Sequence, residues 1–173
     1  MKATLSTEKR LTTKENRSEG IQNYDTDNAY PQRVEDIINS SPVGSLCHNL
    51  ALKFTVGGGF KDAEFSKVKV NGKNVTGDKL LRKIADNLLK FNGVAVHINY
   101  NANYEAVNYN FIPFDYCRLT SLDSDHPNKI AVYDDWQKVN GRVKKEDIDF
   151  IDVFNPAPNK IEQQVEEAGG WEG

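Results

Sequence analysis

Two neighbouring residues, Cys47 and His48, are the first in this sequence whose types could do chemistry together. A cysteine thiol becomes a nucleophile when a histidine takes its proton, provided that the two side chains meet. The apolar spacing around them predicts a helix, in which successive side chains point about 100° apart. We therefore expect no catalytic dyad. Cys47 is predicted to pack as a small apolar residue, and His48 to be an exposed polar one.

Three consecutive glycines, Gly57 to Gly59, could in principle bring backbone amides around a phosphate. The segment lacks both the GxGxxG spacing and the Lys-Ser/Thr ending of phosphate-binding loops. The predicted helix also precedes the glycines, so no helix N-terminus would face a phosphate there. The pattern is instead typical of a helix end followed by a tight chain reversal.

The residues from Asp123 onward resemble the opening of a calcium-binding loop, because oxygen-bearing side chains recur at alternate positions. The match then fails at three places. Pro127 takes a ligand position, Asn128 stands where the loop requires glycine, and Asp134 replaces the final glutamate. The sequence therefore predicts a polar turn and no metal site.

His97 and Arg118 are the remaining candidates, because both fall on the polar faces of predicted neighbouring strands. Together they could form the site of a small α+β enzyme or ligand-binding module. Each is more typical of a plainer role: His97 as a solvent-facing strand residue, and Arg118 as a surface or subunit-contact charge. No carboxylate pair, metal cluster or Ser/His/Asp order stands out, so we expect neither an enzyme nor a cofactor.

Composition limits the class of protein. With 173 residues, 38% of them hydrophobic and 27% charged, the chain can bury one core of ordinary size. The net charge of −3 creates no overall basic field, and residues 144–173 alone hold three basic and eight acidic residues. Any contact with nucleic acid must therefore be local.

The sequence also limits compartment and membrane contact. No stretch approaches 18 consecutive apolar residues, and no apolar run follows the basic residues of the N-terminus, so we expect neither a membrane span nor a secretory signal. Cys47 and Cys117 are the only cysteines and form no CxxC motif. Two free thiols in a reducing compartment are expected, with a single bridge between them left open.

The elements that must position these residues are organised around residues 78–119. Apolar residues recur with helical spacing up to Phe91, and the period then changes to two, which predicts a helix over 78–91 that feeds a β-hairpin. We expect one face of this helix to pack on the first strand. The predicted helix contacts are Leu80, Leu81, Ile84 and Leu88, and their partners are Val94, Val96 and Ile98.

Two further helices are predicted upstream, over 31–39 and 42–55. The second carries an apolar stripe that we expect to face the core, formed by Val43, Leu46, Cys47, Leu50 and Phe54. A short edge strand or hairpin is predicted within 65–75. A mainly antiparallel sheet of four or five strands is predicted over 94–154, which makes the fold class α+β, with N-terminal helices packed on the sheet.

The chain is divided by composition into three parts. Residues 1–29 are predicted to form a flexible polar arm, 30–155 the α+β domain, and 156–173 an acidic helix with an abrupt end. Because the last residues, Trp171 to Gly173, directly follow a helix-stopping Gly-Gly, we expect a truncated chain. Trp136, Phe150, Phe154 and Trp171 are the aromatic residues expected to meet missing parts or neighbouring subunits.

The order of these features resembles the N-terminal, wing-like part of the portal proteins of tailed bacteriophages. Four stretches carry the resemblance: a helix that leads from SPVGSL at 41–46 into FTVGGGF at 54–60, LLKFNGVAVHI at 88–98, YNFIPFDYCR at 109–118, and KIAVY at 129–133. The first stretch looks like the family's helix with a glycine-rich end, and the second like its helix that is followed by a glycine and an apolar strand. The third resembles the family's strand that reaches a proline and then an arginine, and the fourth resembles the partner of that strand. The resemblance covers roughly residues 30–155.

The resemblance implies a structural role and no catalytic residues. Portal proteins form a ring at one vertex of the capsid, through which the terminase motor packages double-stranded DNA that is later ejected. The resemblance implies that the full-length protein associates with itself into a ring and contacts terminase and capsid proteins. It also implies that DNA passes through the ring without sequence specificity, and that no membrane is involved. The expected location is the virion, with host cytoplasm during assembly.

This chain departs from the family in length, because nothing in it could form the long tunnel helices or the clip that docks the motor. Besides the enzyme or ligand-binding module near His97 and Arg118, a host adaptor domain without a DNA role is a further alternative.

Overall fold

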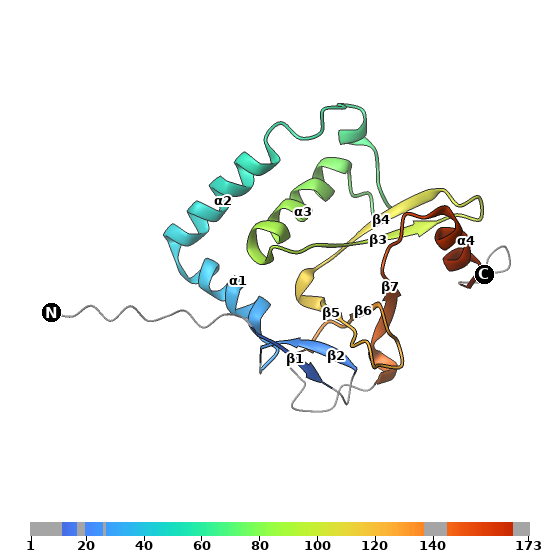
Figure 1. Cartoon of the computed structure of the whole chain (residues 1–173). Coiled ribbons are helices and arrows are strands. Elements are labelled where there is room, and N and C mark those ends of the chain that lie inside the picture. The colour runs from blue at the N-terminus through green and yellow to red at the C-terminus, as the bar shows by residue number, and fades with distance from the viewer. Residues whose placement is uncertain (1–11, 17–19, 26, 137–144, 168–173) are drawn as a thin grey trace.

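The computed structural model describes residues 12–16, 20–25, 27–136 and 145–167, and Figure 1 shows their arrangement. The helices are α1 (Tyr30–Ser40), α2 (Pro42–Val56), α3 (Gly77–Phe91) and α4 (Pro158–Glu167). The strands are β1 (Thr13–Asn16), β2 (Ile21–Tyr24), β3 (Ala95–Tyr100), β4 (Ala106–Ile112), β5 (Cys117–Leu119), β6 (Lys129–Val132) and β7 (Asp149–Asp152). The predicted α+β class is confirmed.

The three predicted N-terminal helices are confirmed, and local signals explain where they begin and end. The Ser41 hydroxyl accepts a hydrogen bond from the Gly44 amide (3.1 Å), which caps α2 directly before its Pro42. Thr76 caps α3 in the same way. At its other end, Asn92 adopts the left-handed conformation (φ 54°) that ends a helix.

The strands of residues 94–154 are antiparallel as predicted, but they do not form one sheet. β3 and β4 make a separate hairpin, whereas β5, β6 and β7 make a three-stranded sheet. Pro113 and the 3₁₀ turn Phe114–Tyr116 separate the two, because proline has no amide hydrogen to continue the ladder. The predicted strand within 65–75 is reduced to one bridge, between Lys69 and Thr76.

The predicted flexible arm needs correction for residues 12–16, 20–25, 27 and 28. β1 and β2 form a hairpin, and a bridge between Ile21 and Thr120 attaches it to β5. Ile21 has no exposed surface and belongs to the core together with Ala131, Trp136 and Ile148. A single well-placed isoleucine thus anchors a segment whose composition is otherwise polar. Residues 1–11 lie outside the described ranges.

The same core corrects the prediction that certain aromatic residues would meet missing parts of the protein or neighbouring subunits. Trp136 is 1% exposed, and its indole N–H donates to the Tyr116 carbonyl at 2.7 Å. Phe150 packs against the core, whereas Phe154 is exposed as expected. Trp171 lies outside the part of the chain that the structure describes.

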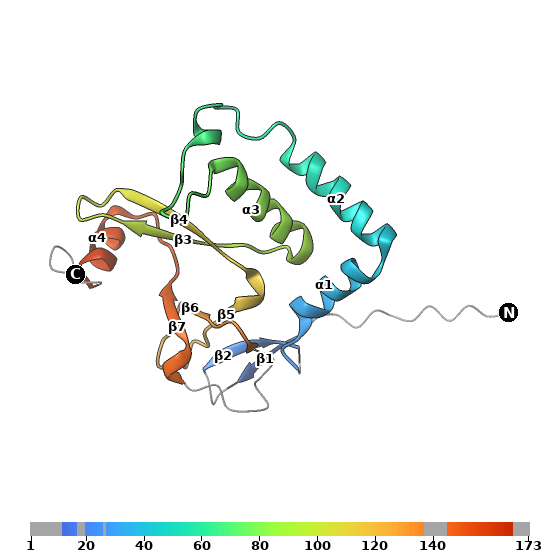
Figure 2. The same ribbon diagram turned by 180° about the vertical axis from the view of Figure 1, so that it is seen from behind.

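Helices α1, α2 and α3 lie together to one side of the β3–β4 hairpin, and α4 is set apart from them, as the two opposite views show (Figures 1 and 2). α3 lies between this hairpin and α2, and α2 forms the outer edge. The predicted face of α3 is rotated: Leu80 is buried, but Leu88 is exposed. Asn87 turns inward instead, because its side-chain oxygen accepts a hydrogen bond from the Phe114 amide (2.9 Å), and Phe91 stacks on the Phe114 ring.

Candidate interaction surface

The apolar stripe of α2 faces solvent, contrary to the prediction that it faces the core. Its exposed fractions are 69% for Val43, 59% for Leu46, 46% for Leu50 and 84% for Phe54, and Cys47 is exposed beside them. We call these five residues the α2 outer face. Only Leu52 of this helix is buried, and the 3.6-residue period places Leu52 on the opposite side.

The inner side of α2 is held largely by polar contacts. The Ser45 hydroxyl donates to the Ile38 carbonyl at 2.8 Å, and the His48 Nε2 atom lies 2.7 Å from the Asp86 carboxylate on α3. The prediction that His48 is exposed is therefore wrong. The prediction overlooked the helical spacing of residues 45, 48 and 52, which places all three on the side of α2 opposite the apolar stripe.

The His48 contact belongs to a network that joins three helices. Lys90 on α3 contacts Asp86 (2.9 Å) and also Glu35 on α1 (3.2 Å). Burial alone would raise the pKa of Asp86, but hydrogen bonds from His48 and Lys90 outweigh it and lower that pKa. Burial would likewise lower the pKa of Lys90, and its two carboxylate partners raise it instead. The network therefore favours the charged forms of Asp86 and Lys90, and the His48 contact joins α2 to α3.

The two cysteines are free and lie in different surroundings. Cys47 is on the outer face while the neighbouring His48 bonds inward to Asp86, so they form no dyad. Cys117 is buried, and burial raises the pKa of its thiol to about 12. A thiol held in this way is unreactive, because the thiolate is the nucleophile.

The structure does not bring His97 and Arg118 together on neighbouring strands. His97 pairs with Asn110 in the β3–β4 hairpin, whereas Arg118 pairs with Ala131 in the other sheet. Arg118 is also fully buried, so it is not the surface charge that was predicted.

The buried guanidinium of Arg118 donates its hydrogen bonds to other groups of the protein. It donates to the Asn28 side chain (2.6 Å) and to the carbonyls of Asn28, Asp115 and Cys117. The Tyr24 and Trp136 rings lie over it at 4.6 and 5.3 Å. Burial lowers its pKa to about 10. Arg118 therefore holds the N-terminal segment to β5 and offers nothing to a ligand.

The glycine segment behaves as the sequence predicts. The Gly57 amide donates to the Lys53 carbonyl (2.9 Å) and the Gly59 amide to the Val56 carbonyl (3.0 Å), which closes α2 and reverses the chain. A side-chain carbon added at Gly59 would lie 2.8 Å from the Asp78 carboxylate. An acidic neighbour at this distance disfavours a phosphate at the loop.

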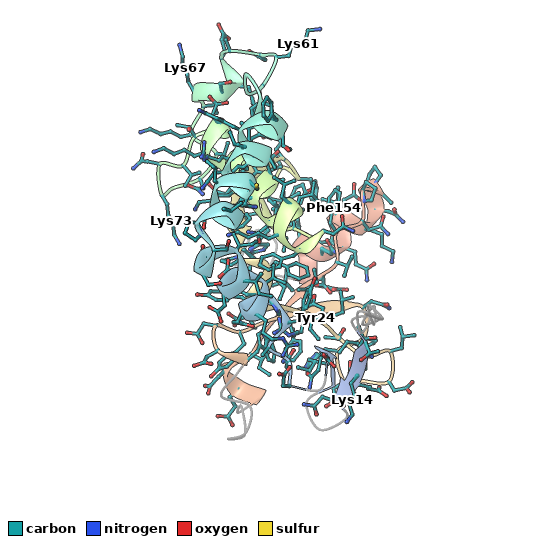
Figure 3. All side chains as sticks on the ribbon, turned by 90° about the vertical axis from the view of Figure 1, so that its left-hand side faces the viewer. Lys14, Tyr24, Lys61, Lys67, Lys73 and Phe154 are labelled. Atoms are coloured by element: carbon teal, nitrogen blue, oxygen red, sulfur yellow. The ribbon has the colours of Figure 1, made fainter. Side chains whose placement is uncertain are left out.

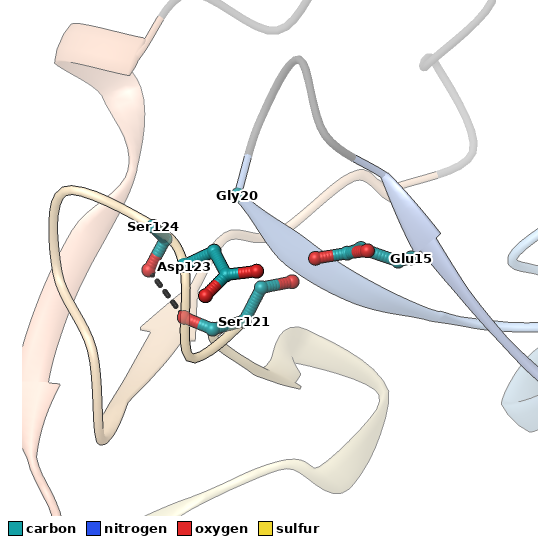
Figure 4. A pocket seen from close by; sticks show the side chains of 5 residues that line it. All are labelled: Glu15, Gly20, Ser121, Asp123 and Ser124. Atoms are coloured by element: carbon teal, nitrogen blue, oxygen red, sulfur yellow. Dashed lines mark hydrogen bonds between the residues drawn. The ribbon is translucent and has the colours of Figure 1, made fainter.

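A shallow pocket of about 350 Å³ lies where the β1–β2 hairpin meets the Asp123 turn (Figure 4). Glu15 extends from β1 toward Ser121 and Asp123, and the Ser124 hydroxyl donates to the Ser121 carbonyl at 2.7 Å. The described residues contain no group of three or more His, Cys, Asp or Glu side chains suited to a metal. The pocket is a polar hollow beside a turn.

Comparisons with known proteins do not assign the chain to a family. The sequence matches no protein-family model, and neither curated proteins nor solved structures give a match. Within the described ranges, no helix combines the length and the apolar character needed to cross a membrane. The α2 outer face is therefore interpreted from its own geometry.

Proposed function

We propose that this chain is a structural protein, the wing-like part of a bacteriophage portal subunit, which assembles with other copies into a ring at the capsid vertex. In that role it acts in the virion with terminase and capsid proteins as partners, and double-stranded DNA passes through the ring. The observation that carries the proposal is the α2 outer face.

The energetics of this face favour burial in an assembly. Fully burying an aliphatic or phenyl side chain is worth about 1.5–3 kcal/mol, so leaving Leu46 and Phe54 in water forgoes a large stabilisation. Leu52 and Val56 add apolar surface to the other side of α2, beside the polar contacts of Ser45 and His48. The outer face is apolar along the whole helix, and such a stripe is typically covered by another element or subunit. In a ring, one face of each subunit meets a different face of the next, which would supply that cover.

Two further observations support a structural role. The element order of a helix with a glycine-rich end, a second helix and an antiparallel hairpin agrees with the portal resemblance. The two residues of the rival enzyme site also lie in different sheets, and Arg118 is buried and makes four hydrogen bonds within the protein. A host adaptor domain would use the same outer face, but it would bind one partner and would not close a ring.

The proposal is tested by the assembly state of the proposed portal subunit. Electron microscopy and mass photometry of the purified protein are expected to show closed rings of one discrete mass, because a heterologous contact with the right rotation closes on itself. A species that stays monomeric at all accessible concentrations would contradict the portal proposal. A stable one-to-one complex with a host protein, without rings, would favour the adaptor domain.

A further inference from the structure

One segment of the chain concentrates exposed positive charge. Between the end of α2 and the middle of α3 lie eight basic residues, all exposed, against only three carboxylates. We call these eight the basic edge: Lys53, Lys61, Lys67, Lys69, Lys73, Lys79, Arg82 and Lys83. The net charge of the whole chain is −3, so this local excess runs against the overall balance.

The charges of the basic edge are not neutralised within the molecule. Elsewhere, Arg33, Lys90 and Lys129 pair with carboxylates. Among the described residues, none of the eight side chains of the basic edge forms an ion pair or hydrogen bond. Lys83 alone has a contact of another kind, over the Phe111 ring at 5.7 Å. The positive potential of this surface is thus left open to a partner.

The basic edge follows the chain around one end of the molecule. Figure 3 shows Lys61 and Lys67 projecting outward at one end of the molecule and Lys73 nearer its middle, with Lys14 near the opposite end. The polar pocket is lined by Glu15, Gly20, Ser121, Asp123 and Ser124, none of which belongs to this edge. The charges therefore lie along the outside of this segment and do not surround that hollow.

We propose that the basic edge binds the phosphate backbone of nucleic acid without reading its sequence. Seven of the eight residues are lysines, whose flexible stems place point charges against phosphates without the bidentate geometry by which arginine recognises guanine. A row of exposed ammonium groups along one segment suits a regular linear polyanion, which meets several of them at once. This inference goes beyond the proposed ring and does not depend on it.

The proposal is tested by fluorescence anisotropy with a labelled 20-base-pair DNA duplex of arbitrary sequence. We expect micromolar affinity at 50 mM salt, unchanged when the sequence is scrambled. If about four phosphates are neutralised, the logarithm of the binding constant should fall with the logarithm of salt with a slope of roughly −3.6. The variant Lys67→Glu/Lys73→Glu is expected to weaken binding at least tenfold.

A matched control separates position from net charge. Lys14→Glu/Lys160→Glu lowers the net charge equally, at exposed lysines outside the basic edge, and should keep affinity within about threefold. The milder Lys61→Gln/Lys73→Gln provides a second test if the charge reversal disturbs folding, which circular dichroism would reveal.

Three results would overturn the inference. The first is no binding of the duplex at 50 mM salt, and the second is equal weakening by both double glutamate variants. The third is displacement of the duplex by poly-glutamate as effectively as by unlabelled DNA, which would assign the edge to an acidic protein surface. Ring formation is measured separately, by the mass of the assembled protein. Absence of DNA binding would therefore overturn this inference without contradicting the ring proposal.

Discussion

Replacement of Arg118 by alanine is expected to lower the free energy of unfolding by roughly 3–5 kcal/mol. The guanidinium supplies the hydrogen bonds to both the side chain and the carbonyl of Asn28, which are buried and lie 90 residues away in sequence. Its loss leaves the Asn28 carbonyl without the Arg118 donor, and the Asn28 side-chain oxygen keeps only the Tyr24 amide (3.0 Å). It also opens a space between Tyr24 and Trp136, whose rings lie over the guanidinium.

The measurement is equilibrium unfolding in urea, followed by circular dichroism. Arg118→Lys should rescue little of the loss, because one ammonium cannot reproduce the planar fork of the guanidinium. Arg33→Ala removes an exposed arginine that pairs with Asp25 and Asp27, and it should cost no more than about 1 kcal/mol. A loss below about 1 kcal/mol for Arg118→Ala would show that the segment before α1 is held by other contacts.

The second large effect is expected on the α2 outer face. In the proposed portal subunit, Leu46→Asp/Phe54→Asp should raise the protein concentration needed for assembly at least a hundredfold, because two charges would have to be buried at the contact. The free energy of unfolding of the isolated chain should change by only about 1 kcal/mol or less, since both side chains are already exposed.

Mass photometry across a dilution series measures this effect. The matched control is Asn49→Asp/Thr55→Asp, which places the same two charges at exposed positions of the same helix outside the stripe. It should assemble like the wild type. If both double variants assemble normally, the α2 outer face is not the subunit contact.

The helices could be predicted because their signals are local. Ser41-Pro42 fixes where α2 begins, and Thr76 and Asn92 bracket α3 within two residues of the predicted ends. The spacing of apolar residues also predicted that α2 is an amphipathic helix, but it did not show which side of the helix faces the core. An apolar stripe looks the same whether it packs on the same chain or on another. The apolar Leu52 on the opposite side was the available signal that two faces needed cover.

The contacts that were missed join residues far apart in sequence. Ile21 is an isolated apolar residue in a polar segment, and its burial depends on a sheet formed more than 100 residues later. Arg118 acquires its role from Asn28, and His48 from Asp86 on another helix. No local pattern marks such pairs, so the sequence led us to place Arg118 and His48 at the surface.

The reactivity of Cys47 in the assembled full-length protein tests the central claim most directly, because this thiol lies within the α2 outer face. Maleimide labelling read by peptide mass spectrometry should be at least tenfold slower at Cys47 in the assembly than in the dissociated Leu46→Asp/Phe54→Asp variant. Cys117, buried and with its pKa raised to about 12, should stay unlabelled in both and serve as the internal control. Equal labelling of Cys47 in the two forms would contradict the claim that subunits meet through α2.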